Sequence, residues 1–516
     1  ADVALVFPEP LPAGAEVRLR LSYAGNRVLR ELGEGTYVVA ARQSWYPNLG
    51  TYVDPADFQL TFRVPAGRDV VAVGRKVAER KEGGENVSVW RTDTPVRVAG
   101  FNYGRFRRLA REDRESGLTV EVHTNQGTSA AVRSIDEAMR RSREGSRPGF
   151  PSGSPGSPGS NSSGDPDELT FTGPELGRVD TSRLAEGAAV DGVNAARIFT
   201  TYFGPLPQRH VALTQQEEWT YGQSWPTLVF LPYLAFLSST QRAQLGLQGA
   251  AGFVEEVGFH EISHQWWGHL VGWSSYRDQW MSEGFAEMSA ALAVQHTQGW
   301  GRYGGFWEAR RRQILTRPAG GLAPWEAGPL TLGHRLTTPR TPTGNVLLYA
   351  KGAFVLHMLR MMLWDGDAKE PDARFVALMK DYAASFAGRE ATTADFRRIA
   401  ERHMVPALDL AGDGTLGWFF RQWVDGTEIP RFRLDLATTP EAGGLRVRGT
   451  VRQEEVGPDF RVILPLYLET DDGTTVRFAQ VPLTGTTPRE VDVLVPTSKK
   501  SKGVRANLRH EVLARD

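Results

Sequence analysis

The five-residue segment HEISH at 260–264, followed by Glu283 after eighteen intervening residues, constrains this chain more than any other feature. Two histidines four positions apart lie about 40° from one another around a helix axis, so both imidazoles project from one face. His260 and His264 can therefore bind one metal ion, and Glu261 can reach a water molecule beside it. Glu283 is the candidate third ligand. Three protein ligands with an open fourth position are typical of catalytic zinc, so we predict one Zn²⁺ per chain.

A surface helix with two solvated histidines is the alternative interpretation of this segment. Its neighbours argue against that alternative because they leave no wide polar face: Phe253, Val257, Ile262, Trp266, Trp267 and Leu270. Buried imidazoles and carboxylates need partners, and one metal ion would satisfy all of them. A longer zinc motif would require Gly at 267 and His at 270, which hold Trp and Leu here. This register excludes His269 as a third ligand of that type.

Two acidic residues near Glu283 have open roles. Asp278 could cap the helix that carries Glu283, or it could orient a zinc-binding histidine through the second ring nitrogen. Glu287 lies one turn beyond Glu283 on the same helix face. For Glu287 we expect an ordinary helix salt bridge in preference to a contact with a zinc ligand. Neither residue belongs to the predicted site.

Motifs that extend beyond the five-residue segment carry a family resemblance. The chain reads HEISHQWWG at 260–268, DQWMSEGFA at 278–286, FGPLP at 203–207, YAKGA at 349–353 and WFFRQW at 418–423. These stretches resemble the aminopeptidase N family of gluzincin zinc metallopeptidases. Weaker similarity extends toward both ends, so most of the chain is covered, although only the central part is covered by specific motifs.

The resemblance implies roles for two further side chains. Tyr349, in the Y-x-KGA segment, would donate a hydrogen bond from its phenol O–H to the oxyanion that forms during peptide hydrolysis. A core aromatic residue is the alternative, because apolar residues follow it at helical spacing. Glu261 would be the general base that takes a proton from the attacking water. We therefore predict a zinc-dependent aminopeptidase that acts on peptide substrates.

One family motif is incomplete in this chain. The family's G-x-M-E-N segment carries a Glu that holds the free α-amine of the substrate, but the corresponding stretch begins Gly222-Gln223-Ser224 and has no acidic residue. These three are the candidate substrate-binding residues. Glu217 and Glu218 could replace the missing carboxylate, or they could form a solvated pair at a strand end. A zinc endopeptidase or broader peptidase is thus the alternative function, and a non-catalytic peptide-binding protein is a more remote one.

Composition excludes several classes of partner. The 60 basic and 60 acidic residues give zero net charge, and no basic block suggests a nucleic-acid partner. No apolar run approaches membrane-spanning length, since the longest candidate, 228–237, is short and contains Pro232. Cysteine is absent, which excludes disulfides. We expect a soluble monomer, and a first residue other than Met gives a slight preference for an exported protein.

Hydrophobic periodicity predicts an α+β multidomain chain that begins with a β domain over 1–187. Apolar residues alternate with polar ones at 17–23, 58–64 and 118–122, which predicts strands there. A Gly/Ser/Pro-rich segment at about 142–166 is expected to be disordered. By resemblance, this domain is the family's saddle-like N-terminal sheet.

The remainder of the chain divides into two further predicted domains. Residues 188–425 have helical periodicity and hold every candidate catalytic residue. By resemblance, this region is a thermolysin-like domain. Residues 426–516 change to a period of two, with Asp471-Asp472-Gly473 as a hairpin turn, and predict a small β-sandwich. The large helical C-terminal domain of many family members is expected to be absent.

Overall fold

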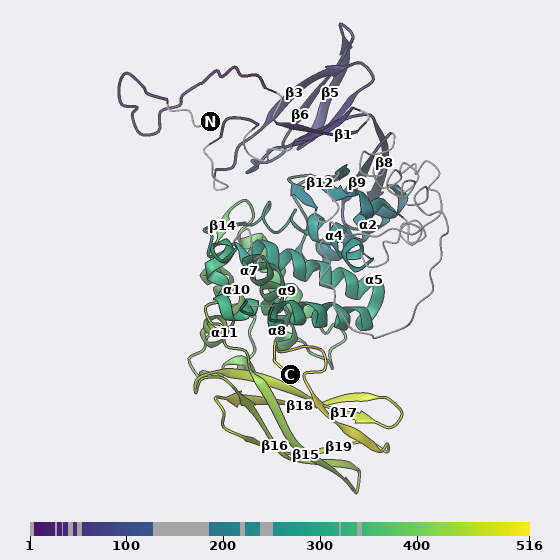
Figure 1. Cartoon of the computed structure of the whole chain (residues 1–516), viewed down its shortest axis with the longest axis vertical. Helices are drawn as coiled ribbons and strands as arrows, with labels where there is room; N and C mark the ends of the chain where they lie inside the picture. Colours follow the sequence, from purple (N-terminus) through teal and green to yellow (C-terminus); the bar gives the residue numbers. More distant parts are fainter. Residues whose placement is uncertain are drawn as a thin grey trace, which may run out of the picture.

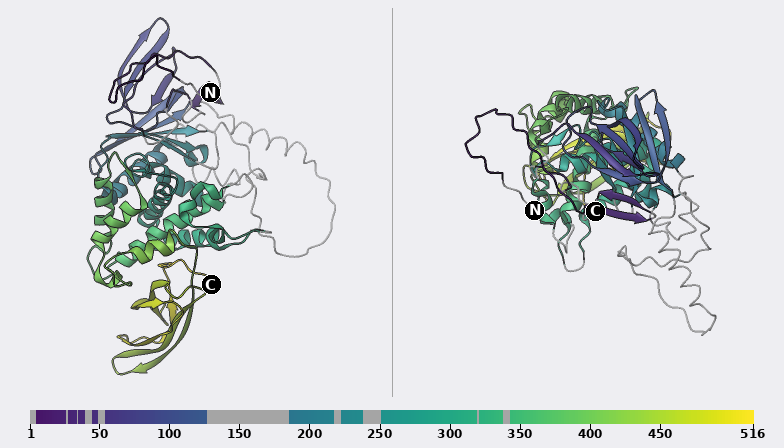
Figure 2. Two further views of the ribbon diagram at one scale, coloured as in Figure 1. Left: turned by 90° about the vertical axis from the view of Figure 1, so that its left-hand side faces the viewer. Right: turned by 90° about the horizontal axis from the view of Figure 1, so that it is seen from above.

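Three structural regions follow one another along the long axis of the molecule (Figure 1). The computed structural model describes residues 5–25, 28–33, 35–39, 45–48, 54–126, 185–216, 222–237, 251–318, 321–337 and 343–516. β-Sheets lie at both ends and helices lie between them, an arrangement that two further views also display (Figure 2). The predicted α+β fold class is confirmed. The Gly/Ser/Pro-rich segment at 142–166 lies outside the described residues, as do Glu217 and Glu218.

Two antiparallel sheets build the N-terminal region. The first has the order β1-β2-β7-β4 and consists of β1 (Leu29–Gly33), β2 (Thr36–Val39), β7 (Phe101–Gly104) and β4 (Asp69–Ala72). The second has the order β3-β6-β5 and consists of β3 (Gln59–Pro65), β6 (Glu85–Arg91) and β5 (Arg75–Glu82). The strand predicted at 58–64 is thus confirmed. Its apolar side chains Leu60, Phe62 and Val64 pack on the buried Trp90.

The strand predicted at 17–23 is wrong. The described residues 5–25 contain no strand. The alternating side chains Val17, Leu19, Leu21 and Tyr23 are all exposed, and the segment extends away from the N-terminal sheets (Figure 1). Alternation produces a strand only where a neighbouring strand supplies hydrogen bonds, and no described strand pairs with this segment.

A five-stranded sheet connects the N-terminal part of the chain to the helices. Its order is β11-β12-β10-β9-β8, and its strands are β11 (Gln223–Trp225), β12 (Leu228–Pro232), β10 (His210–Gln216), β9 (Leu118–Asn125) and β8 (Phe106–Asp113). The strand predicted at 118–122 is β9, which pairs in parallel with β10. The sheet therefore crosses the predicted domain boundary at residue 187. Its edge strand β11 carries two of the candidate substrate-binding residues.

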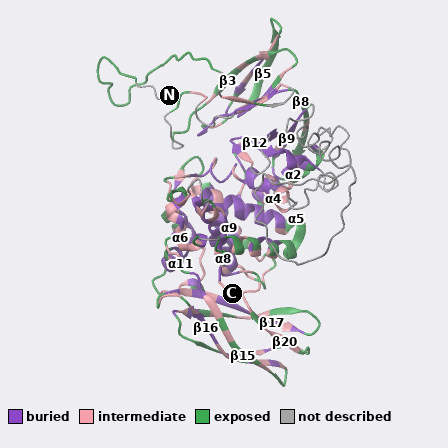
Figure 3. Cartoon of the chain, in the orientation of Figure 1, coloured by how far each residue is buried: buried purple, intermediate pink, exposed green. Residues whose placement is uncertain are grey.

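Helices dominate the middle of the molecule, where buried residues are concentrated (Figure 3). The longer helices are α2 (Ala185–Phe203), α4 (Ala251–Ser263), α5 (Trp280–Leu315), α8 (Gly352–Leu363), α9 (Ala373–Ser385), α10 (Thr393–His403) and α11 (Gly417–Trp423). Short elements connect them: η2 (Tyr233–Phe236), α6 (Pro324–Ala327), η4 (Leu330–Leu336), α7 (Thr343–Val346), the π-helical turn η5 (Leu347–Lys351) and η6 (Pro406–Leu408). Strands β13 (Gly272–Trp273) and β14 (Glu390–Ala391) form a small parallel pair.

Within the described residues, one continuous helical stretch, Thr343–Leu363, is long and apolar enough to cross a membrane. This stretch is longer than 228–237, the longest apolar run predicted from the sequence, and it was not predicted. Most of its apolar window is buried against other parts of the protein. In this structure the stretch is a core helix of the helical region.

Helix α5 consists of two arms that meet at Gly299, whose φ of 84° and ψ of 178° are not helical. The Nε atom of Arg310 lies 2.6 Å from Oε1 of Glu287, although the two residues are 23 positions apart. In a straight helix with a rise of 1.5 Å per residue, their separation would be about 35 Å. The second arm therefore runs back alongside the first, and glycine permits the reversal because a positive φ carries no Cβ penalty.

Two three-stranded antiparallel sheets form the C-terminal region. One has the order β15-β16-β19 and the other the order β18-β17-β20; the strands are β15 (Arg431–Glu441), β16 (Gly444–Glu454), β17 (Arg461–Thr470), β18 (Thr475–Thr484), β19 (Arg489–Val495) and β20 (Ser501–Ala506). Val447 and Val495 of the first sheet share a core cluster with Leu468 of the second. This packing agrees with the predicted β-sandwich, and the predicted turn at 471–473 connects β17 to β18.

Candidate metal centre and active site

Three side-chain atoms from α4 and α5 form a compact triangle. His260 lies on α4, His264 directly follows the last residue of α4, and Glu283 lies in the first turn of α5. The Nε2 atoms of His260 and His264 are 3.2 Å apart. Oε2 of Glu283 lies 3.5 Å from Nε2 of His260 and 3.4 Å from Nε2 of His264. Tetrahedral ligands bound at about 2.0–2.1 Å from zinc would be about 3.3–3.4 Å apart. The spacing of these three donor atoms therefore fits a zinc ion.

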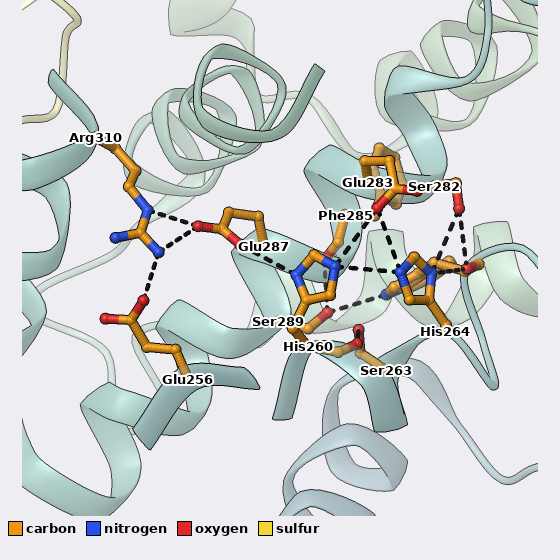
Figure 4. A network of polar contacts seen from close by, with 11 residues as sticks. Glu256, His260, Ser263, His264, Ser282, Glu283, Phe285, Glu287, Ser289 and Arg310 are labelled. Atoms are coloured by element: carbon orange, nitrogen blue, oxygen red, sulfur yellow. Dashed lines mark hydrogen bonds and ion pairs between the residues drawn. The ribbon is translucent and has the colours of Figure 1, made fainter. Parts of the chain in front are cut away.

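Hydrogen bonds at the far side of each ring orient both imidazoles. Nδ1 of His260 lies 3.1 Å from Oε2 of Glu287, and Nδ1 of His264 lies 2.8 Å from the carbonyl oxygen of Trp267 (Figure 4). Both partners are acceptors, so in the neutral rings each Nδ1 carries the proton and donates it. The lone pair of each Nε2 then faces the centre of the triangle, as metal binding requires.

The carboxylate of Glu283 is the third donor. Burial alone would raise its pKa, but the adjacent imidazoles of His264 and His260 lower the pKa well below its usual value. The group is therefore ionised at neutral pH. Its buried Oε2 lies farther from both rings than a normal N–H···O hydrogen bond would place it. An ionised oxygen in this position is a suitable ligand for a divalent cation.

A pocket of about 630 Å³ opens beside the triangle. It is lined by the three candidate ligands and by Glu261, Tyr349, Gly222, Gln223 and Ser224, so the structure brings all eight predicted site residues together. Gly222 lies against the general-base candidate, because a Cβ built on it would be 2.3 Å from Cγ of Glu261. The volume of the pocket is that of an ordinary site for a small molecule or a peptide residue.

Tyr349 lies on η5, a π-helical turn, which is a local geometry often found at functional sites. Its ring stacks on the imidazole of His260, with the ring centroids 5.6 Å apart and the planes 4° from parallel. Burial, together with the negative charges of Glu283 and Glu261, raises the pKa of the phenol well above its usual value. The hydroxyl therefore remains protonated and can donate a hydrogen bond into the pocket.

The candidate substrate-binding residues differ in what they can offer. Gln223 and Ser224 lie on the edge strand β11, at the wall of the pocket. Oγ of the buried Ser224 accepts a hydrogen bond of 2.9 Å from Nε2 of Gln265, which lies two residues after the end of α4. Neither residue supplies a carboxylate for a substrate amine.

The structure resolves the open roles of two acidic residues. Asp278 neither caps α5 through its side chain nor contacts a zinc-ligand histidine. Its Oδ1 accepts hydrogen bonds from the amide and hydroxyl of Thr393, at 2.8 and 3.0 Å, and so holds the start of α10. Glu287 was expected to form an ordinary salt bridge, and this prediction was incomplete: the residue pairs with Arg310 and also contacts His260.

Three further charged residues line the pocket and were missed by the sequence analysis: Arg97, Glu256 and Arg310. Glu256 could have been found, because it lies one turn before His260 on the same face of α4. Arg97 and Arg310 could not, since both depend on long-range contacts. Arg97 donates to Glu390 at 2.8 Å and to the carbonyl oxygen of His269 at 3.0 Å.

The central region of the chain is similar in sequence to known peptidases. The peptidase family M1 domain matches residues 247–423. Probable aminopeptidase 2 of Sulfurisphaera tokodaii is 23% identical over 249 residues, which cover 46% of this chain and 28% of that protein. Glutamyl aminopeptidase of Sus scrofa is 31% identical over 154 residues, which cover 29% of this chain and 15% of that protein. The matched part thus spans less than a third of either relative.

Solved structures are similar in fold. Aminopeptidase A of Legionella pneumophila, in complex with aspartic acid, matches 94% of this chain and 48% of its own, with a TM-score of 0.60 and 12% identity. A two-domain M1 zinc metallopeptidase bound to L-arginine matches 79% of this chain and 74% of its own, with a TM-score of 0.50 and 18% identity. At such identities the similarity concerns the fold alone.

Proposed function

We propose that this chain, which belongs to the aminopeptidase N-like gluzincin family, is a zinc-dependent aminopeptidase that removes N-terminal residues from peptides. One observation carries the proposal: the three donor atoms of His260, His264 and Glu283 have tetrahedral spacing in a pocket that also contains Glu261 and Tyr349. An acid–base group and a hydrogen-bond donor beside a metal site are the components that metal-assisted amide hydrolysis requires.

The chain's own residues divide the proposed reaction among them. When bound, zinc would polarise the scissile carbonyl and acidify a water molecule. Glu261 takes a proton from the attacking water and passes it to the departing amine. Tyr349 donates its phenol O–H to the carbonyl oxygen as negative charge develops there. We propose one zinc ion per chain, because the described residues contain one group of His and Glu side chains with suitable spacing.

A zinc endopeptidase, or a peptidase of broader specificity, is the second candidate. The observation that favours it is the composition of β11, which has no carboxylate for a free α-amine and directs Ser224 toward Gln265. The same zinc, base and phenol would serve either enzyme. The two candidates differ only in whether the substrate amine must be free.

A matched pair of substrates distinguishes these functions. The purified chain, loaded with one equivalent of zinc, would be assayed on an aminoacyl anilide and on its N-acetylated counterpart. We expect cleavage of the free-amine substrate only, and loss of that cleavage after chelation. Equal rates on the two substrates would favour the endopeptidase, while cleavage that survives complete zinc removal would eliminate both candidates.

A further inference from the structure

Four polar or charged side chains, in contact one after another, connect the zinc-ligand triangle to the contact between α4 and the returning arm of α5 (Figure 4). Nδ1 of His260 contacts Oε2 of Glu287, and the other oxygen of Glu287 accepts from Nε of Arg310 at 2.6 Å. Arg310 also donates to Oε2 of Glu256 on α4, at 2.5 Å. One guanidinium therefore bridges two carboxylates, and one of these carboxylates orients a zinc ligand.

The bridge is largely buried, although its residues line one wall of the pocket. The side chains of Arg310 and Glu287 are each 12% exposed, and that of Glu256 is 19% exposed. A carboxylate in such surroundings requires a charged or hydrogen-bonding partner, and removing one member of a buried ion pair leaves the other strongly destabilised. Without Arg310, the carboxylates of Glu287 and Glu256 would face one another without the cation between them.

We propose that Arg310 is a positioning residue for the metal centre. It fixes the carboxylate of Glu287 against Nδ1 of His260, and this contact turns Nε2 of His260 toward the zinc position. Arg310 thus acts on the metal through Glu287 and not by touching it. The inference rests on the zinc site of the proposed function.

The same contact connects zinc affinity to the fold of α5. Glu287 lies on the first arm of α5 and Arg310 on the second, and the reversal at Gly299 brings them together. The second arm therefore contributes a group that the metal centre needs, although every zinc ligand lies before it in the sequence.

Zinc affinity measured by competition with a chromogenic chelator tests the proposal. Arg310→Met keeps a long apolar side chain but removes the cation, and we expect zinc binding to weaken by about 10–100-fold. Arg302→Met is the matched control, because Arg302 pairs with Glu255 at 2.5 Å between the same two helices, with exposed fractions of 57% and 33%. The control should bind zinc within about twofold of the wild type, since that exposed pair has no contact with His260.

A double-mutant cycle separates positioning from general loss of structure. If Arg310 acts through Glu287, Arg310→Met should cause little additional loss in a Glu287→Gln background. Independent, multiplicative losses would overturn the proposal, as would wild-type affinity in Arg310→Met or equal weakening in the Arg302→Met control. If circular dichroism shows that Arg310→Met does not fold, Arg310→Lys, which retains the charge, replaces it. In the wild-type background Arg310→Lys should lose less zinc affinity than a substitution that removes the cation. In the Glu287→Gln background it should cause little additional loss. Failure of the wild type to bind zinc would instead refute the proposed function.

Discussion

Gly284 and Gly352 face one another where α5 touches α8, so closely that a Cβ on Gly284 would lie 2.7 Å from the carbonyl carbon of Gly352. Gly284 directly follows the candidate zinc ligand Glu283, and Gly352 comes three positions after Tyr349. The contact between these two backbones therefore sets how near the phenol comes to the metal centre. It gives a physical reason for glycine in both the EGFA and the KGA segments.

Gly284→Ala should destabilise the protein and disturb the site at the same time. A Cβ at this position meets backbone, which cannot move as a side-chain end can, so we expect a loss of about 1–3 kcal/mol in the free energy of unfolding. Gly305→Ala, at an exposed position on the second arm of α5 where a Cβ would meet no atom within 4 Å, is the control and should stabilise by about 0.5–1 kcal/mol. Denaturant titration measures both, and equal effects of the two changes would contradict the packing argument.

Glu261→Gln should bind zinc normally and lose turnover. The amide cannot accept the proton from water, and general-base catalysis typically contributes about 10²–10⁴-fold. Metal analysis and kcat, measured on the same preparation, check the two halves of this prediction. His260→Ala provides the contrast, because it should lose zinc as well as activity. A fully zinc-loaded Glu261→Gln enzyme with unchanged kcat would remove Glu261 from the mechanism.

Tyr349→Phe should lower kcat by about 10²–10³-fold with little change in KM, since the phenol would stabilise charge that develops only in the transition state. Because the pKa of Tyr349 is raised well above its usual value, its ionisation should not limit activity below pH 10. Any alkaline decline of kcat below pH 10 should therefore have the same midpoint in Tyr349→Phe as in the wild type. A kcat equal to that of the wild type would show that the phenol plays no part.

Lys351 should make the protein more stable as the pH rises above neutrality. Its ammonium group is fully buried and donates to the carbonyl oxygen of Gly426 at 2.8 Å, and burial lowers its pKa to about 7. The unfolded chain, with a lysine pKa near 10.4, then binds more protons between pH 7 and 10. The free energy of unfolding should rise across this window by up to about 1.4 kcal/mol per pH unit from this group.

Denaturant titrations at pH 7, 8 and 9 would measure that rise. Lys351→Met removes the titrating group while retaining the length of the side chain, so its stability should depend less steeply on pH. Identical slopes for the variant and the wild type would show that Lys351 is not the source.

The parts of the site that could be predicted depend on local geometry. Helical spacing alone places the imidazoles of His260 and His264 on one face, and the motif then indicates Glu283. Strands β3, β9 and those of the C-terminal sandwich could be predicted for the same reason, because a period of two in strands buried on one face is a local pattern. In these segments the neighbouring sheet or core is present, so local preference and tertiary packing agree.

The parts that could not be predicted depend on contacts between distant residues. The pairing of Arg310 with Glu287 exists only because Gly299 reverses α5, and a lone glycine in a helical pattern does not disclose the direction of the chain after it. Asp278 binds the start of α10, 115 positions away. The alternating segment at 17–23 has strand composition, yet no described strand lies beside it.

The shared sheet has a consequence for how the protein can be divided. Because β9 pairs with β10 in parallel, a fragment starting at residue 188 would leave one whole side of β10 without hydrogen-bond partners. Such a fragment would retain every candidate zinc ligand and still be prone to self-association through that bare edge. A fragment that keeps this pairing must therefore begin before Leu118, inside what looks from the sequence like an accessory domain.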